Sequence, residues 1–416
     1  MTDPLQHAIE ELRGKKIAIV GSGTNNQRLS EFLKKAGIEF EIINNWKSSD
    51  ELIGKLDDFD LVFRTPGLPF LADAIQQAKF KGVEILSQTK LFFKLCLAPI
   101  IGITGTKGKG TTSSLVAKIL SAAGKKVWLG GNIGVDPFEF FEQVKPEDFV
   151  VLELSSFQLQ DLEQSPHIAV VLNITSDHLD HHRSRDEYIK SKSNLIDYQN
   201  ETDFTVLHPA LPDWFKQLGK GKKIIFDPES VLDFKTKLLG VHSYENIAAA
   251  VAVAKILKID EAVIRESISE FETLPHHLQK IREFDQITYV DDAVSTNNDT
   301  AIAAISAINT PIVLIVGGHD KGLDFTELGK KILTSPNIKG LVIIGEVTDK
   351  ILKAVDGFEG QVRTGAKSMP EILQQARSIA ERGDTILISP ATDSFDMFKN
   401  MYDRADQFVK AVEGIS

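Results

Sequence analysis

The stretch LAPIIGITGTKGKGTTSSLVAKILSAAG, residues 97–124, carries the strongest structural signal in the chain. It begins with an apolar run that predicts a buried strand, continues through a glycine-rich turn and ends in a helical segment. Its glycines expose backbone N–H groups, Lys109 supplies a positive charge, and hydroxyl groups stand where the helix begins. Because the N-terminus of a helix attracts anions, this unit predicts a site for a triphosphate.

The loop departs from the common phosphate-loop pattern in two places. Five residues rather than four separate Gly102 from Gly108, and Gly110 follows Lys109 where a serine or threonine is usual. Lys109 is expected to neutralise the β- and γ-phosphates, and either Thr111 or Thr112 to reach a magnesium ion. The alternative is a glycine-rich strand-to-helix turn that binds nothing.

The composition of the whole chain is that of a folded multidomain protein. Its 416 residues are too many for one hydrophobic core, and 42% hydrophobic with 25% charged residues is typical of a globular protein. A formal charge of −11 argues against binding to nucleic acid or to a membrane surface. Its one cysteine, Cys96, fits a reducing compartment, and no apolar stretch is long enough to span a bilayer, so we expect a cytoplasmic protein.

Short strands alternate with helices along the chain, which predicts an α/β fold of three domains. The segments from KKIAIVGSG to DLVFRTPGLP predict an N-terminal Rossmann-like domain over residues 1–95. The phosphate loop opens a central domain of the P-loop ATPase type, with a mostly parallel sheet, over residues 96–273. The strand-like segments from ITYVDD to DTILISPA predict a C-terminal Rossmann-like domain over residues 274–416. Ligands are expected at the carboxyl ends of the strands.

The turn Gly21-Ser22-Gly23 follows the first predicted strand but lacks the third glycine of the dinucleotide-binding fingerprint. No acidic residue ends the next strand, so a nicotinamide cofactor is not expected. Two interpretations stay open for this turn, namely a tight connection without a ligand, or a site for a nucleotide phosphate or uridine.

The motifs after the phosphate loop give the chain a family resemblance. GTKGKGTT is similar to the ATP loop of the Mur ligases and of the related folylpolyglutamate synthases. GGNIG at residues 130–134, ELSSFQL at 153–159, NITSDHLDHH at 173–182 and HSYENIAAA at 242–250 follow in the order of that superfamily. The C-terminal LISPATDSFDMFKN most resembles the glutamate-adding branch. The resemblance implies a monomeric, ATP-dependent ligase of peptidoglycan precursor synthesis, which joins D-glutamate to UDP-N-acetylmuramoyl-L-alanine through an acyl phosphate.

The resemblance also assigns roles around the phosphate loop. ATP binding is implied for Gly105, Thr106, Lys107, Gly108, Lys109, Gly110, Thr111, Thr112, Asn246 and Asp292. Catalysis is implied for Lys109, Glu153, His178 and Lys192, and ligation of two magnesium ions for Thr111, Glu153, His178 and Lys192. A carboxylate at the end of a buried strand, as expected for Glu153, needs a partner, which agrees with a metal ligand. Pattern alone favours a solvated Lys192, whereas the resemblance implies a carbamylated lysine that supports the metal site.

Substrate binding is implied at three groups of residues. The loops that hold the uridine diphosphate match Gly21, Ser22, Gly23, Thr24, Thr65, Pro66 and Gly67. The sugar-peptide substrate is assigned to Asn132, and Ser155 is also assigned to substrate binding. The C-terminal domain matches the active-site turn and the glutamate site at Thr296, Asn297, Lys321 and Ser394. A substrate with two carboxylates needs such cationic and hydroxyl donors.

Several departures from the family pattern concern specificity. His277 replaces an arginine near the nucleotide, Val294 a lysine, Ser243 an asparagine and Met401 an aromatic residue, while Asn44 and Asn45 replace the groups that touch uracil. Use of L-glutamate therefore stays open. A folylpolyglutamate-synthase-like ligase is disfavoured by the extra N-terminal unit, and a simple P-loop kinase or GTPase by the absence of guanine-reading motifs. A non-catalytic Mur-like binding protein would have lost Lys109, Glu153, His178 or Lys192, and all four are present.

Overall fold

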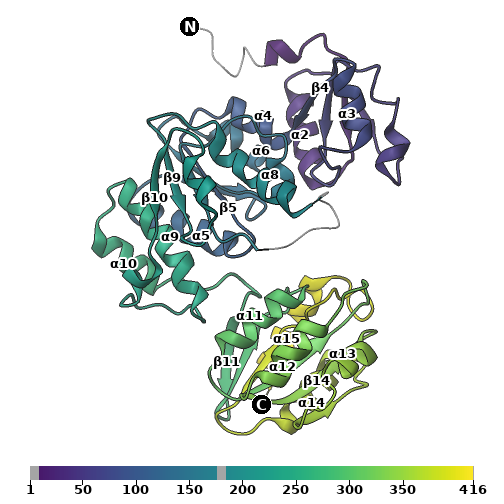
Figure 1. Cartoon of the computed structure of the whole chain (residues 1–416), viewed down its shortest axis with the longest axis vertical. Coiled ribbons are helices and arrows are strands. Elements are labelled where there is room, and N and C mark those ends of the chain that lie inside the picture. The colour runs from purple at the N-terminus through teal and green to yellow at the C-terminus, as the bar shows by residue number, and fades with distance from the viewer. Residues whose placement is uncertain (1–8, 176–183, 416) are drawn as a thin grey trace. The chain divides into compact units, whose positions relative to one another are not determined.

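The computed structural model describes residues 9–175 and 184–415, in which the strands form three β-sheets (Figure 1). Two compact units make up the chain. One comprises Met1–Thr236 and Tyr244–Phe271, and the other comprises Lys237–Ser243 and Glu272–Ser416. The predicted α/β class is confirmed, and the domain boundaries near residues 95 and 274 stay predictions.

The first sheet has the strand order β2-β1-β3-β4 and is parallel throughout. Its strands are β1 (Ile17–Val20), β2 (Glu41–Ile43), β3 (Leu61–Arg64) and β4 (Glu84–Ser87), with helices α2 (Thr24–Lys35), α3 (Asp73–Phe80) and α4 (Gln88–Leu95). Alternate residues of β1 enter two different hydrophobic clusters, Ile17 and Ile19 on one face, Ala18 and Val20 on the other. Both faces of this central strand are therefore buried, as in other parallel sheets.

The second sheet has the order β10-β9-β8-β5-β7-β6 and is also parallel throughout. Its strands are β5 (Ile100–Thr104), β6 (Val127–Gly131), β7 (Phe149–Glu153), β8 (Ile168–Val171), β9 (Phe204–Leu207) and β10 (Lys222–Ile225). The associated helices are α5 (Lys109–Ala122), α6 (Pro137–Phe140), α7 (Ser156–Leu159), α8 (Arg185–Asp197), α9 (His242–Ile256) and α10 (Glu261–Ser269). Because β5 lies between β7 and β8, the loops after three neighbouring strands meet at one edge of the sheet.

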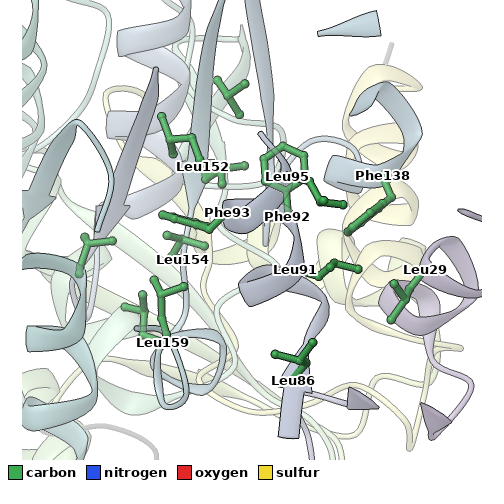
Figure 2. Close-up of a cluster of buried hydrophobic side chains, with 14 of the residues drawn as sticks. Leu29, Leu86, Leu91, Phe92, Phe93, Leu95, Phe138, Leu152, Leu154 and Leu159 are labelled. Atoms are coloured by element: carbon green, nitrogen blue, oxygen red, sulfur yellow. The ribbon is translucent and has the colours of Figure 1, made fainter. Parts of the chain in front are cut away.

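One hydrophobic cluster joins the first sheet to the second. Figure 2 shows four side chains of α4 at its centre, with side chains of α2, β4, β7, α6 and α7 around them; the four are Leu91, Phe92, Phe93 and Leu95. The ring of Phe92 meets Phe138, Phe140 and Phe141 edge to face, with centroids 5.9, 6.1 and 5.8 Å away. Such aromatic pairs add about 0.5–1.5 kcal/mol each to the free energy of burial. The two sheets therefore share a continuous apolar core.

The third sheet has the order β11-β12-β16-β13-β14-β15, and only its edge strand β11 is antiparallel to its neighbour. Its strands are β11 (Gln279–Phe284), β12 (Ile287–Asp291), β13 (Ile312–Gly317), β14 (Ile338–Ile344), β15 (Gln361–Arg363) and β16 (Thr385–Ile388). Its helices are α11 (Asn298–Ala307), α12 (Thr326–Thr334), α13 (Thr348–Ala354), α14 (Met369–Ile379) and α15 (Met401–Glu413). Over residues 9–175 and 184–415, no helix is both long and apolar enough to cross a membrane.

Candidate active site

The predicted phosphate loop lies between β5 and α5, at the carboxyl edge of the second sheet. Two glycines are required by its shape. Gly108 is the N-cap of α5 with φ = 79°, and a Cβ there would lie 2.1 Å from Asn246 Oδ1. Gly105 has φ = 154°, and a Cβ there would lie 2.7 Å from Leu172 Cβ. Only glycine fits these backbone positions, which bring the loop close to Asn246 and Leu172.

Hydrogen bonds from neighbouring segments fix the loop in place. The Thr106 amide donates to Asn173 O at 2.9 Å, and Thr106 Oγ1 accepts from the Thr175 amide at 2.9 Å. The same hydroxyl lies 3.0 Å from the Tyr188 hydroxyl. Farther along, Thr112 Oγ1 donates to Asn246 Oδ1 at 3.3 Å. The structure therefore brings Asn246 to the loop, although more than a hundred residues separate them in the sequence.

Two lysines contact the backbone of the loop. Lys109 Nζ donates to Thr106 O at 2.8 Å, and Lys192 Nζ donates to Gly105 O at 2.9 Å. Lys192 also lies over the Tyr188 ring, 4.6 Å from its centroid, and is only 2% exposed. The interpretation of Lys192 as a solvated lysine, which pattern alone favoured, is wrong, because helix α8 packs this residue against the loop.

Glu153 ends β7 and is buried, with 6% of its surface exposed. Asn132 Nδ2 donates to Glu153 Oε1 at 3.4 Å. Burial raises the pKa of Glu153 above its usual value, and the positive charge of Lys109, the Asn132 bond and the charge of Lys192 oppose this in decreasing order. The site therefore combines a buried carboxylate with two cations at the edge of the phosphate loop.

This donor set fits part of a magnesium site. Magnesium prefers carboxylate and hydroxyl oxygens, and Glu153 and Thr111, the latter in the first turn of α5, could supply them. Within the two described ranges of the chain, no group of three or more His, Cys, Asp or Glu side chains is arranged so that it could hold a metal ion. His178 lies outside the described residues, so its role as a magnesium ligand stays a prediction.

The two loops predicted to hold the uridine diphosphate follow β1 and β3, which are neighbouring strands. They approach each other closely, since a Cβ on Gly21 would lie 3.3 Å from Thr65 Cγ2. Ser22 and Gly23 are exposed beside them. In the second sheet, Ser155 caps α7 and its hydroxyl accepts from the Gln158 amide at 3.3 Å. Ser155 thus has a structural role apart from the predicted contact with substrate.

In the third sheet, Asp292 follows β12 and is 8% exposed. Ser389 Oγ donates to its Oδ2 at 2.6 Å, and the Leu278 amide donates to its Oδ1 at 3.2 Å. The pKa of Asp292 is raised to about 7, mainly by burial and to a lesser extent by the neighbouring Asp291, while these hydrogen bonds oppose the rise. Asp292 is therefore a buried acid that titrates near neutral pH.

The residues predicted to hold glutamate lie on loops of the third sheet. Lys321 Nζ pairs with Asp393 Oδ1 at 3.2 Å, and Asp393 directly precedes Ser394 in the sequence. Ser394 is 1% exposed, and its hydroxyl has no hydrogen-bond partner within the described parts of the chain. A buried hydroxyl without a partner is unusual and marks a position where a ligand could bind. Thr296 precedes Asn297, which caps α11 and accepts from the Thr300 amide at 3.0 Å.

Two buried residues at these sites were missed by sequence reasoning. Tyr188 precedes Lys192 by one helical turn and touches both Thr106 and Lys192. Arg404 in α15 is fully buried and donates to three carbonyls, which are those of Ala293, Thr392 and Asp393. The spacing of Tyr188 from Lys192 could have indicated the first, whereas an arginine on an amphipathic helix carries no signal of burial.

Known proteins resemble this chain in sequence and fold. Residues 103–225 match the protein family described as "Mur ligase middle domain". Residues 277–392 match the family described as "Mur ligase, glutamate ligase domain". The UDP-N-acetylmuramoylalanine–D-glutamate ligase of Symbiobacterium thermophilum is 34% identical over 97% of this chain and 98% of its own, and that of Acetivibrio thermocellus is 32% identical over 100% of both. The crystal structure of MurF ligase from Thermotoga maritima in complex with ADP has the same fold, with a TM-score of 0.61, 17% identity and 99% of each chain covered. The chain therefore belongs to the Mur ligase family.

Proposed function

We propose that this chain is a cytoplasmic, monomeric, ATP-dependent ligase that joins D-glutamate to UDP-N-acetylmuramoyl-L-alanine in peptidoglycan precursor synthesis. The observation that carries the proposal is the cluster of Glu153, Lys109 and Lys192 at the phosphate loop. It occurs in a chain that matches D-glutamate ligases over nearly its whole length.

The reaction has two steps. A carboxylate oxygen of the sugar-peptide substrate attacks the γ-phosphorus of ATP, ADP leaves, and an acyl phosphate forms. The glutamate amine then attacks the acyl carbon, phosphate leaves, and the new amide nitrogen loses its extra proton. Lys109 stabilises the negative charge that spreads over the phosphate oxygens in the first step. Because phosphate is a good leaving group, the side chains act mainly by positioning the three substrates.

Each substrate has a proposed place on the chain. The phosphate loop, Asn246 and Asp292 bind ATP, the Gly21–Thr24 and Thr65–Gly67 loops bind the uridine diphosphate, and Asn132 and Ser155 bind the sugar-peptide part. Lys321, with its positive charge, and Ser394, with its unpaired hydroxyl, bind the carboxylates of glutamate near Thr296 and Asn297. Magnesium held by Thr111, Glu153, His178 and Lys192 would add positive charge around the phosphates. In this role Lys192 would be carbamylated, and the anionic carbamate would replace the ammonium cation that lies near Glu153 in the unmodified chain.

The test is phosphate release from ATP in the presence of UDP-N-acetylmuramoyl-L-alanine and either D- or L-glutamate. We expect release with D-glutamate, little with L-glutamate, and about a hundredfold less in the Lys109→Ala variant. Preferred use of L-glutamate would correct the stereochemistry alone. Turnover with a folate and glutamate, but not with the uridine substrate, would assign the chain to the folylpolyglutamate branch. Binding without turnover would make it a Mur-like binding protein.

A further inference from the structure

A buried arginine joins the first and second sheets beside the proposed uridine-diphosphate loop. Arg64 is the last residue of β3 and has no exposed surface. Its Nη2 donates to the Asp161 carboxylate and to Phe157 O at 2.7 Å, and its Nη1 donates to Leu68 O at 3.1 Å. Asp161, just beyond α7 in the second sheet's part of the chain, is 3% exposed. An ion pair thus lies between the two sheets, away from water.

Stabilising the packing of the two sheets does not by itself explain this ion pair. Removing two charges from water has a large cost in free energy, and apolar residues of similar volume often stabilise a core as well or better. The shared hydrophobic cluster around α4 already joins these two sheets. An arginine differs from an apolar residue because its N–H donors lie in one plane at fixed angles, so its acceptors must stand in a defined arrangement. The feature that Arg64 adds is therefore orientation.

The partners of Arg64 lie on the two segments whose relative position matters for the reaction. On one side, Arg64 directly precedes Thr65, and the Leu68 carbonyl that it binds belongs to the turn closed by the bond from the Leu68 amide to Thr65 O, 3.0 Å long. On the other side, Phe157 and Asp161 belong to the segment that leaves β7 just after Glu153. Arg64 thus ties the uridine-diphosphate loop to the strand end that carries Glu153.

A second side chain strengthens the same connection. Gln160 Oε1 accepts from the Phe70 amide at 3.0 Å, and Gln160 Nε2 donates to Glu187 Oε1 at 2.9 Å. Glu187 lies on α8, the helix that presents Lys192 to Gly105. The contacts therefore continue from the segment that includes the uridine-diphosphate loop and Phe70, through residues 160 and 161, to the helix that contacts the phosphate loop.

We propose that Arg64 is a positioning residue for the ligase reaction. Its ion pair with Asp161 fixes the position of the Thr65–Gly67 loop relative to the Glu153 end of β7. It thereby places the substrate carboxylate against the phosphate loop. This inference rests on the proposed function, because it takes the ligand of that loop to be the uridine diphosphate of the sugar-peptide substrate.

The test replaces both charges at once with apolar residues, in the variant R64M/D161L. This change leaves no unpaired buried charge, so we expect the thermal unfolding midpoint to stay within a few degrees of wild type. The KM for UDP-N-acetylmuramoyl-L-alanine should rise about 10-fold or more and kcat should fall about 10-fold, while the KM for ATP changes less than about twofold. The Arg64→Lys variant keeps the charge but has fewer directed donors. Its KM for UDP-N-acetylmuramoyl-L-alanine should therefore lie between that of wild type and that of R64M/D161L. It also serves if the paired variant does not fold.

The matched control is R28Q/E139Q, which removes an exposed ion pair between α2 and α6 that also links the first and second sheets. Its kinetics should equal those of wild type. A wild-type enzyme that ligates, with R64M/D161L unchanged in every kinetic constant, would overturn the inference alone. A general loss, in which the KM for ATP rises together with that for the uridine substrate and the unfolding midpoint falls, would reduce Arg64 to a structural residue. A wild-type chain without uridine-dependent turnover would remove the proposed function, and the inference with it.

Discussion

Glu153 and Asp292 are both buried acids at the ends of strands, yet their surroundings differ. Glu153 ends β7 and lies near Lys109, Asn132 and Lys192, which favour its ionised form. Asp292 follows β12, accepts from a hydroxyl and a backbone amide, and lies beside a second acid. Burial raises the pKa of both, but no cation opposes it among the causes that act on Asp292, whose pKa is about 7.

The difference shows that a position at a strand end does not by itself define a role. A carboxylate beside two lysines at a phosphate loop is equipped to stay ionised among phosphates and metal ions. A carboxylate held by a hydroxyl and an amide, with a pKa about 7, is better suited to accept a hydrogen bond from a neutral group such as a ribose hydroxyl. The following predictions test this contrast, in order of decreasing effect.

The largest effect is expected from Glu153→Gln, which keeps the shape of the side chain and removes its charge. If the ionised form takes part in the phosphate chemistry, kcat should fall about 1000-fold. The measurement is phosphate release at saturating substrates over a range of magnesium concentrations. Glu163→Gln is a matched control, because Glu163 is an exposed acid paired with Lys90. A Glu153→Gln enzyme with kcat near that of wild type would give Glu153 the same passive role as any buried acid.

The next effect concerns Lys109, a cation that acts on the pKa of Glu153 but not on that of Asp292. Lys109→Ala should lower kcat about 100-fold, because a charge aimed at the phosphates is lost. Lys109 is also the largest influence that lowers the pKa of Glu153, so its removal should raise that pKa. The acid limb of the pH profile of kcat/KM should then move to higher pH. Lys118→Ala, on the same helix, should leave the limb in place; an unmoved limb in Lys109→Ala would show that Glu153 does not define it.

The site near Glu153 could be predicted from the sequence far better than the site near Asp292. The phosphate loop follows from one contiguous stretch in which glycines, a lysine and hydroxyls stand at fixed spacing. Its geometry is local, so Gly105, Gly108 and Lys109 could be assigned without knowing the rest of the fold. Glu153 was identifiable because a carboxylate that ends an apolar run needs a partner.

Other features depend on contacts between distant segments, and no local pattern encodes them. Arg64 ends a strand and Arg404 lies on an amphipathic helix, positions where arginines usually reach solvent, yet both are completely buried. The pairing of β11 with β12 and the strands β9 and β10 were likewise absent from the sequence interpretation. Burial of Lys192 was misjudged from pattern because it depends on the packing of α8 against the loop after β5. These outcomes were decided by tertiary packing.

A smaller effect is expected from Asp292→Asn. This change removes a charged acceptor without removing a group that contacts the phosphates, so the KM for ATP should rise about 10-fold while kcat changes little. Steady-state kinetics with varied ATP would measure it, and Asp299→Asn, at an exposed position of α11, provides the control. A fall in kcat as large as that of Glu153→Gln would mean that the two acids share one role.

The smallest effect is on stability, and its sign follows from the raised pKa of Asp292. Between pH 4 and 7 the unfolded chain has this acid ionised, whereas the folded chain keeps it protonated up to a pKa of about 7. The folded state therefore holds one more proton, and each rise in pH through this window weakens it. Relative to Asp292→Asn, the unfolding midpoint of wild type should fall by about 3 °C or more from pH 5 to 7, and the difference should stay constant above pH 8. Thermal unfolding of both proteins across this range tests the expectation. A difference that does not change with pH would mean that the pKa of Asp292 is not raised in the folded protein, and the contrast between the two acids would disappear.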